Sequence, residues 1–238
     1  MTTGVRRRMG VEERRQQLIG VALELFSRRS PEEVAIDEIA AAAGISRPLV
    51  YHYFPGKLSL YEAALRRAAD DLTARLTEPP EGPVGARLLR VMGRVFDFVE
   101  DHGPGFSALL RGGPAAGSST ASALVDGVRQ AAYEQILAHL EVTGPSARLE
   151  LVVRSWVSLV ESTALLWLDG RRVDRAELEA RLVGDFAAMV AVSAAYDEEL
   201  AALAARLLAG ASAGGPLGDL AGRLGALLAA ADPEPVPS

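Results

Sequence analysis

The residues best suited to chemistry lie in one stretch, Ser46 to Lys57, which reads Ser-Arg-Pro-Leu-Val-Tyr-His-Tyr-Phe-Pro-Gly-Lys. Tyr51, His52 and Tyr53 are consecutive, and Arg47 precedes Tyr51 by one helical turn. Neighbouring side chains on a helix point in directions about 100° apart, so the three rings cannot all face one core. An exposed aromatic residue beside an arginine is suited to contacts with DNA phosphates and base edges. A half-buried aromatic cluster is the alternative interpretation.

Lys57 ends this stretch and is the only lysine in the sequence, although Lys and Arg together number 25. So strong a preference for arginine is typical of coding bias and carries little functional information. A single retained lysine, by contrast, indicates a specific role. We interpret it as a contact with a DNA phosphate.

Three helices are predicted to position these residues. Apolar residues at helical spacing predict a first helix over residues 11–28. A second short helix over residues 36–43 stops at Gly44, and Ser46 is a favourable N-cap for a third helix over residues 47–54. Two short helices joined by a glycine-containing turn form a helix-turn-helix, whose second helix can enter the major groove.

Within this motif the side chains divide into an inner and an outer set. We expect Ile45, Val50 and Phe54 to pack inward. The side chains expected to face DNA are Arg47, Leu49, Tyr51, His52 and Tyr53. Helical hairpins are common in all-α proteins, so the aromatic and basic residues carry this interpretation rather than the hairpin alone.

Composition excludes several classes of protein and leaves DNA binding open. The chain has 238 residues and no Cys, which excludes disulfide scaffolds, thiolate zinc sites and iron–sulfur clusters. It has 3 His, none at metal-binding spacing, so we expect no metal and no cofactor. The net charge is -6, yet residues 1–57 contain nine basic and seven acidic residues, so this first quarter is positive while the rest is acidic.

The remainder of the chain predicts further helices separated by segments rich in Pro and Gly, and strand signals are nearly absent. One predicted separator is Gly103-Pro104. The expected fold is all-α: a three-helix DNA-binding domain followed by a larger helical domain for dimerisation and ligand binding. The expected domains are a flexible basic arm at 1–10, the helix-turn-helix domain at 11–57, the helical domain at 58–196, and an Ala-rich helical extension with a disordered tail at 197–238.

The motif resembles the TetR family of bacterial transcription regulators. The resemblance covers roughly Arg14 to Leu65 and is most specific in Ala43-Gly44-Ile45-Ser46, in Leu49 to Phe54 and in Gly56-Lys57. One departure is Ala35, where the family often has a capping Ser or Thr. The resemblance implies a homodimer that binds double-stranded DNA at an inverted-repeat operator, most simply as a ligand-responsive repressor.

Carried over position by position, the resemblance implies two kinds of DNA contact. Arg47, Leu49 and His52 resemble base-edge readers, and Tyr51, Tyr53 and Lys57 resemble groove and phosphate contacts. The complete predicted DNA-binding set is Ser46, Arg47, Pro48, Leu49, Tyr51, His52, Tyr53 and Lys57.

For the second domain, the sequence predicts the arrangement of helices but few residues suited to chemistry. An effector cavity is expected to be lined by Met92, Phe96, Phe106, Leu110, Tyr133, Trp156, Val160 and Trp167, although plain core packing is the alternative for each. The few polar candidates for orienting a ligand are Arg94, His102, Arg111 and Glu161, and the favoured alternative for each is a solvated or salt-bridged role, so we expect an apolar or amphipathic effector. Apolar rows such as Val152–Leu166 and Leu178–Ser193 suggest a four-helix dimer interface, with intrachain core as the alternative.

Other functions are less compatible with the sequence. No phosphate-binding loop, nucleophile elbow or metal motif is present, so we expect no enzyme activity. Leu151 to Leu168 contains Arg154 and Glu161, so we expect no membrane span and a cytoplasmic, nucleoid-associated protein. The competing hypothesis is a helical small-molecule-binding or interaction protein without sequence-specific DNA binding.

Overall fold

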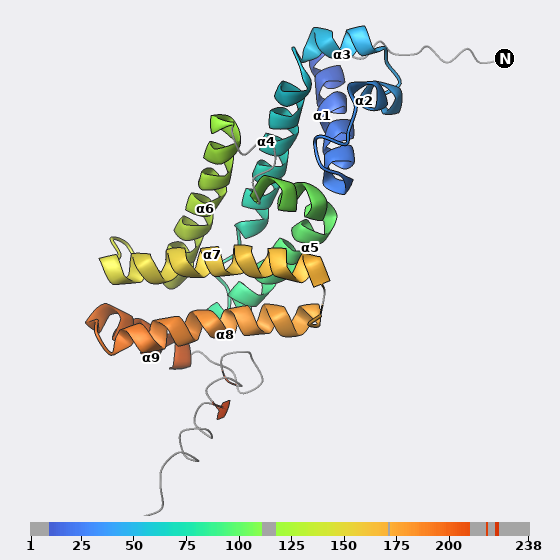
Figure 1. Ribbon diagram of the computed structural model, residues 1–238. Helices are drawn as coiled ribbons and strands as arrows, with labels where there is room; N and C mark the ends of the chain where they lie inside the picture. Colours follow the sequence, from blue (N-terminus) through green and yellow to red (C-terminus); the bar gives the residue numbers. More distant parts are fainter. Residues whose placement is uncertain (1–9, 111–117, 171, 210–217, 219–221, 224–238) are drawn as a thin grey trace, which may run out of the picture. The chain divides into compact units, whose positions relative to one another are not determined.

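The computed structural model describes residues 10–110, 118–170, 172–209, 218 and 222–223, and within these ranges it contains helices and no strand (Figure 1). The predicted all-α fold is therefore confirmed. The helices are α1 Val11–Arg28, α2 Ile36–Ala42, α3 Arg47–Tyr53, α4 Lys57–Leu76, α5 Val84–Leu110, α6 Ser119–Leu140, α7 Ala147–Gly170, α8 Arg175–Ala194 and α9 Glu198–Ala209. The predicted basic arm at residues 1–9 and most of the predicted extension beyond residue 209 lie outside the described residues.

The chain forms two compact units. The first comprises the described parts of Met1–Leu72 and Phe98–Val128, and the second those of Thr73–Asp97 and Arg129–Ser238. Helices α4, α5 and α6 each contribute residues to both units.

The first unit has an apolar core shared by α1, α2, α3 and the first half of α4. Each of these four helices contributes a fully buried side chain, which in chain order are Leu18, Ile39, Val50 and Leu60. Phe26 of α1 meets Tyr61 of α4 edge-on, with ring centroids 5.1 Å apart. Burial raises the pKa of Tyr61 to about 12. The short helices α2 and α3 are thus held by packing against two longer ones.

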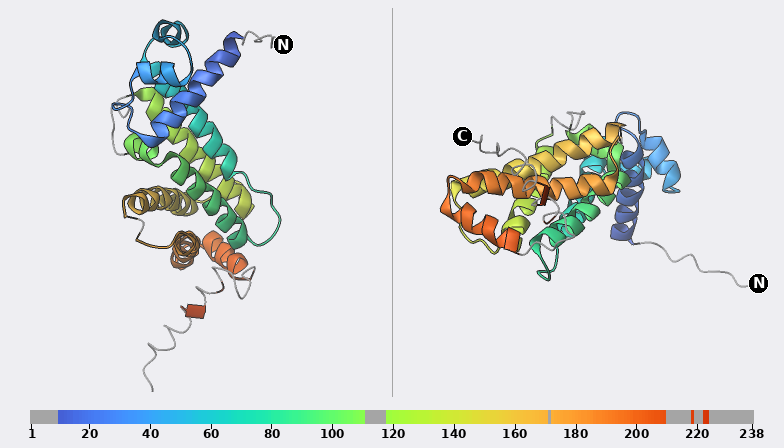
Figure 2. Two further views of the ribbon diagram at one scale, coloured as in Figure 1. Left: turned by 90° about the vertical axis from the view of Figure 1, so that its right-hand side faces the viewer. Right: turned by 90° about the horizontal axis from the view of Figure 1, so that it is seen from below.

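The second unit contains α7 and α8 side by side, with α9 packed beside α8 (Figures 1 and 2). Trp156 of α7 lies against Phe186 of α8 with ring centroids 5.1 Å apart, and its indole N–H donates to the Leu182 carbonyl at 2.8 Å. Val152 and Leu178 are also buried. These members of the predicted apolar rows therefore belong to the intrachain core, which was the alternative to an interface.

Several apolar side chains of α7 and α8 remain exposed, among them Leu166 of the first predicted row. Leu151, Leu166 and Val192 are 66%, 72% and 70% exposed. Among the described residues, α7 is the one helix long and apolar enough to cross a membrane by length and composition, and 33% of its most apolar window is buried. A core helix of a soluble protein meets the same criterion, and α7 carries the core residue Trp156.

The predicted break at Gly103-Pro104 is wrong, because α5 continues through both residues to Leu110. Proline removes one backbone hydrogen bond from a helix interior. The helix has 27 residues, so the backbone hydrogen bonds of the turns before and after Pro104 keep it continuous. Gly103 is also buried. The helix therefore tolerates the proline.

Candidate nucleic-acid interface

The turn between α2 and α3 has a geometry that requires Gly44. Gly44 adopts φ +66°, the left-handed region that glycine enters without the cost of a Cβ atom. The Gly44 amide donates to the Ala41 carbonyl at 3.1 Å, and the Ile45 amide donates to the Ala40 carbonyl at 3.0 Å. This pair of bonds is the Schellman arrangement that ends a helix and redirects the chain. The predicted end of the second helix at Gly44 is thus confirmed.

The start of α3 differs in one detail from the sequence prediction. Ser46 occupies the N-cap, but its hydroxyl makes no capping hydrogen bond. An N-cap side chain normally accepts from the second or third amide of the helix. Here the second residue is Pro48, which has no N–H, and the third, Leu49, donates to the Ser46 carbonyl at 3.0 Å. The Ser46 side chain therefore remains exposed.

The outer face of α3 presents most of the predicted side chains. Val50 is fully buried and Phe54 is 3% exposed, whereas Leu49 and Tyr51 are 37% and 42% exposed. Arg47, Pro48 and His52 are exposed as well. The inward and outward sets follow the prediction except for Ile45 and Tyr53, which are half-buried against the core. The aromatic run is not enclosed, since two of its three rings are exposed.

Arg47 is oriented by two neighbours. Its guanidinium donates to the Asp37 carboxylate at 2.9 Å and lies 5.7 Å from the centre of the Tyr51 ring. A hydrogen bond to Tyr51 and the charge of Asp37 raise the pKa of Arg47, so it stays cationic. The sequence analysis did not identify Asp37 as a site residue. Asp37 and Arg47 lie on different helices, α2 and α3, so no local sequence pattern indicates their pairing.

Lys57, at the start of α4, points back to the turn between α1 and α2. Its ammonium lies 2.7 Å from the Pro31 carbonyl oxygen, 3.2 Å from that of Val34 and 3.5 Å from that of Glu32. A phosphate contact by Lys57 would have to replace at least one of these bonds. The predicted phosphate contact therefore stays a prediction.

The residues predicted to line an effector cavity are mostly packed in the second unit. Met92, Phe96, Tyr133, Trp156, Val160 and Trp167 are all buried. Phe96 and Trp167 meet edge-on, with ring centroids 5.4 Å apart. The side chains of Phe106 and Leu110, and all of Arg111, lie outside the described residues.

Two of the predicted polar ligand contacts are held in ion pairs. Glu161 accepts two bonds from Arg129, at 2.6 and 2.9 Å. Arg94 pairs with the buried Glu78 at 2.8 Å, and Arg90 pairs with the same carboxylate at 2.5 Å. Burial opposes ionisation of Glu78, but hydrogen bonds from Arg90 and Arg94 prevail and lower its pKa. A third candidate, His102, stacks on Phe98 at 4.4 Å.

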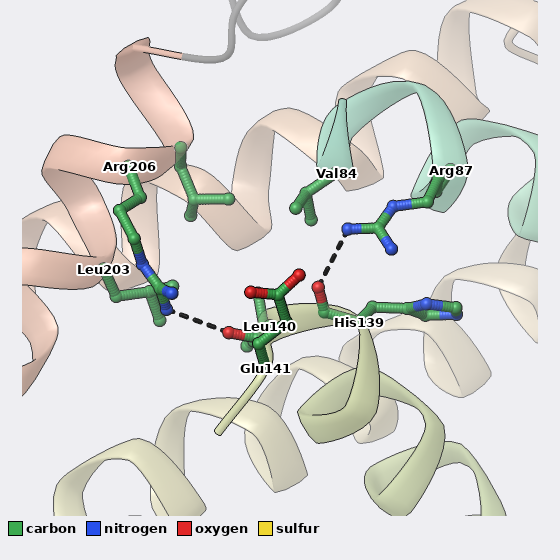
Figure 3. Close-up of a pocket in the computed structure, with 8 residues that line it drawn as sticks. Val84, Arg87, His139, Leu140, Glu141, Leu203 and Arg206 are labelled. Carbon is green, nitrogen blue, oxygen red and sulfur yellow. Dashed lines mark hydrogen bonds between the residues drawn. The ribbon is translucent and has the colours of Figure 1, made fainter. Parts of the chain in front are cut away.

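A small cavity of about 150 Å³ lies elsewhere in the second unit, between the start of α5, the end of α6 and α9 (Figure 3). Arg87 donates to the His139 carbonyl and Arg206 to the Leu140 carbonyl, each at 2.9 Å, so two cations neutralise the carboxyl end of α6. Burial, with Arg87 nearby, lowers the pKa of His139. These contacts join three helices, and the sequence analysis predicted none of them.

Family models match two regions of the chain. Residues 18–64 match the model described as "Bacterial regulatory proteins, tetR family", and residues 84–189 match "Tetracyclin repressor-like, C-terminal domain". A crystal structure of a tetR-family transcriptional regulator from Streptomyces coelicolor is 77% identical, with a TM-score of 0.89 over 93% of this chain and 100% of that chain.

Curated relatives match this chain over less than half of its length. The HTH-type transcriptional activator FasR of Mycolicibacterium smegmatis is 34% identical over 105 residues, which are 43% of this chain and 48% of the relative. The HTH-type transcriptional regulator BetI of Escherichia coli is 34% identical over 91 residues, which are 37% of this chain and 47% of the relative. The chain thus spans about half the length of the curated relatives it matches.

Proposed function

Because this chain belongs to the TetR family of bacterial regulatory proteins, we propose that it is a transcriptional regulator that binds an inverted-repeat operator as a homodimer. The observation that carries the proposal is the outer face of α3, where Arg47, Leu49, Tyr51 and His52 are exposed together. A helix placed after a tight turn in this way can enter the major groove. In this proposal residues 11–57 form the DNA-binding domain, and residues 58–196 form the domain for dimerisation and effector binding.

The DNA contacts fall into two classes on α3. Arg47 offers a bidentate donor for guanine, and Leu49 an apolar contact for a thymine methyl group. His52 is placed beside them for base edges, while Ser46, Tyr51 and Tyr53 suit phosphate and groove contacts. Lys57, at the start of α4, is a phosphate contact in this proposal, made when its ammonium exchanges the carbonyl of Pro31 or Val34 for a phosphate oxygen.

The homodimer is supported by the exposed apolar residues of α7 and α8. A two-fold dimer presents two copies of α3 to successive major grooves, about 34 to 36 Å apart on B-DNA. Exposed leucine and valine on two neighbouring long helices suit an isologous four-helix interface. We place the protein in the cytoplasm at the nucleoid, and without catalytic activity, because its family relatives are described as regulators.

An apolar or amphipathic effector is proposed to act through the second domain. Phe96, Trp156 and Trp167 are buried in its core, so such a ligand enters only in a conformer that opens a space among these aromatic side chains. An effector alters operator affinity only if it binds one conformer of the dimer more tightly than another. The two conformers must differ in the distance between the two copies of α3. Repression is the simplest outcome, because a dimer seated on a promoter excludes polymerase.

The test is a selection of bound duplexes with the purified protein, followed by affinity measurements on the selected operator. Replacing Arg47→Ala together with Tyr51→Ala is expected to weaken operator binding at least tenfold, and Arg66→Ala, which alters an exposed side chain of α4, serves as the control. Selection of no duplex at low salt, or an unchanged affinity in the double variant, would exclude α3 as the reading helix and favour a helical binding protein without DNA recognition.

A further inference from the structure

The cavity beside the carboxyl end of α6 has a buried inner end and a mouth that faces solvent. Arg87 and Leu140 are 4% and 2% exposed, whereas the other two charged residues of its lining, Glu141 and Arg206, are exposed. Its volume of about 150 Å³ corresponds to about five molecules of liquid water. A small organic molecule of a similar size therefore fits inside.

The inner end holds polar atoms that the protein leaves unpaired. Within the described part of the chain, Arg87 Nε and His139 Nε2 are buried and have no hydrogen-bond partner. Both residues are more than nine-tenths buried. The bond that Arg87 does make, to the His139 carbonyl at 2.9 Å, uses one of the five N–H donors of a guanidinium. Because burial without a partner costs free energy, these atoms indicate a group that completes the site.

The charges around the cavity favour an anion. Figure 3 shows the guanidinium groups of Arg87 and Arg206 pointing into the cavity from opposite sides, with the Glu141 carboxylate between them. The carboxyl end of a helix such as α6 carries about half a negative charge. Two full positive charges exceed that half charge and the single charge of Glu141 together. The site therefore remains positive.

The rest of the lining selects among anions. Leu140, Leu203 and Leu207 are buried, and together with Val84 they form an apolar wall. Inorganic phosphate has no apolar part to place against this wall, and it loses more hydration on burial than a monoanion does. A carboxylate matches the planar fork of a guanidinium, and a short hydrocarbon chain suits the leucines.

A purely structural role for the two arginines is the alternative. Arg87 and Arg206 cap α6 through one bond each, both of 2.9 Å, to the carbonyls of His139 and Leu140. Capping explains these two bonds. It does not explain why Arg87 is buried with an unpaired Nε, or why an apolar cavity lies beside it.

We propose that the cavity between α5, α6 and α9 binds a short-chain carboxylate. The carboxylate group pairs with Arg87 at the inner end, Arg206 adds positive charge at the mouth, and the hydrocarbon chain lies against Leu203 and Leu207. The exposed Glu141 side chain turns toward solvent when the ligand enters. This site shares no lining residue with the aromatic core proposed for the effector, and it does not depend on DNA binding.

NMR of the full-length protein with labelled histidine tests the proposal, because the chain has only 3 His and His139 is beside Arg87. Sodium butyrate is added up to about 20 mM at constant ionic strength, and the signal lost in His139→Gln identifies His139. We expect a saturable shift of this signal with a dissociation constant of about 1 mM, and no shift of the exposed His52.

Two further probes separate charge from hydrocarbon. Inorganic phosphate carries only the charge, and 1-butanol carries only the chain, so neither is expected to shift His139 at the same concentration. An equal shift with phosphate or with 1-butanol would overturn the assignment to a carboxylate. No shift with butyrate, or an unsaturable shift of all three histidines, would overturn the site itself.

Variants with opposite effects distinguish binding from capping. Arg87→Gln is expected to abolish the shift, but this buried residue also supports the fold. The decisive pair is therefore at the mouth, where Arg206→Gln should weaken butyrate binding about threefold and Glu141→Gln should strengthen it about threefold. Arg172→Gln, which alters an exposed side chain between α7 and α8, is the control and should leave binding unchanged.

An unchanged affinity in Glu141→Gln would contradict the proposal, because a structural role of the arginines does not predict tighter binding when a carboxylate is removed. None of these measurements contains DNA. Failure of the protein to bind an operator would overturn the proposed function and leave the carboxylate site standing.

Discussion

At the scale of single residues, the proposed DNA interface depends on how Arg47 is held. Its guanidinium pairs with Asp37 at 2.9 Å, and both side chains are more than half exposed. Exposed pairs of this kind contribute little to folding, because solvent and salt screen the two charges. The pair therefore matters for the direction of the Arg47 side chain more than for stability. It also places a negative charge beside a surface that approaches phosphates.

Replacing Asp37→Asn is expected to separate these two effects. Loss of the carboxylate removes a repulsion, so affinity for a scrambled duplex should rise several-fold. Loss of the partner frees Arg47, so the ratio of operator to scrambled affinity should fall. Fluorescence anisotropy on the two duplexes measures both, with Glu24→Gln on the exposed face of α1 as the control. An unchanged ratio would show that Asp37 does not orient Arg47.

A second residue-scale prediction concerns His139. Burial lowers its pKa, with a further contribution from Arg87. Because the native state then binds the proton less readily than the unfolded chain, the free energy of unfolding falls as pH drops below about 6.5. The slope from one such group is at most about 1.4 kcal/mol per pH unit.

Urea unfolding followed by circular dichroism at pH 5.5 and 7.5 measures this loss. His139→Gln is expected to reduce the difference in unfolding free energy between the two conditions, whereas His52→Gln, which alters an exposed residue, should leave it unchanged. An equal difference in wild type and His139→Gln would refute the assignment.

At the scale of elements, α2 has a helix end that the sequence leaves uncapped. Ala35 occupies the N-cap of α2 in extended conformation, with no side-chain hydrogen bond, and it is exposed. Asp37 and Glu38 in the first turn compensate in part through the helix dipole. The departure noted in the sequence is therefore real, but it does not prevent the helix from forming, because Ile36 and Ile39 are buried in the core.

Replacing Ala35→Ser is expected to increase the free energy of unfolding by about 0.5 to 2 kcal/mol, since a hydroxyl at this position can accept an amide hydrogen bond. Ala41→Ser, at an exposed position in the last turn of the same helix, is the matched control and should lower stability slightly. Urea titrations of the three proteins provide the comparison. Equal effects at the two positions would show that the cap is not the cause.

At the scale of the whole molecule, the exposed apolar side chains of α7 and α8 are the proposed dimer contact. Leu166 and Val192 are 72% and 70% exposed. Their replacement by charged residues leaves the monomer core intact, because neither side chain contributes to it.

Leu166→Glu combined with Val192→Glu is expected to convert a dimer into a monomer at micromolar concentration, measured by analytical ultracentrifugation. Operator affinity should fall with it, since one half-site alone is bound weakly. Ala201→Glu, on the exposed face of α9, is the control. A dimer that persists in the double variant would place the interface elsewhere.

Local chemistry in the sequence determined the short helices α2 and α3 and the exposed face of α3. Gly44 ended α2 as predicted, because a left-handed turn residue acts through its own backbone. Helical periodicity predicted Val50 and Phe54 in the core, because spacing alone separates the two faces of a helix.

Contacts between distant residues were decided by the tertiary structure. Lys57 meets Pro31 26 positions away, and Arg87 meets His139 52 positions away, so neither pairing leaves a local pattern. Trp156 and Leu166 share one predicted apolar row, yet one is core and the other is exposed. Periodicity shows that a residue is apolar and on a helix, but which neighbour covers it depends on how the helices pack.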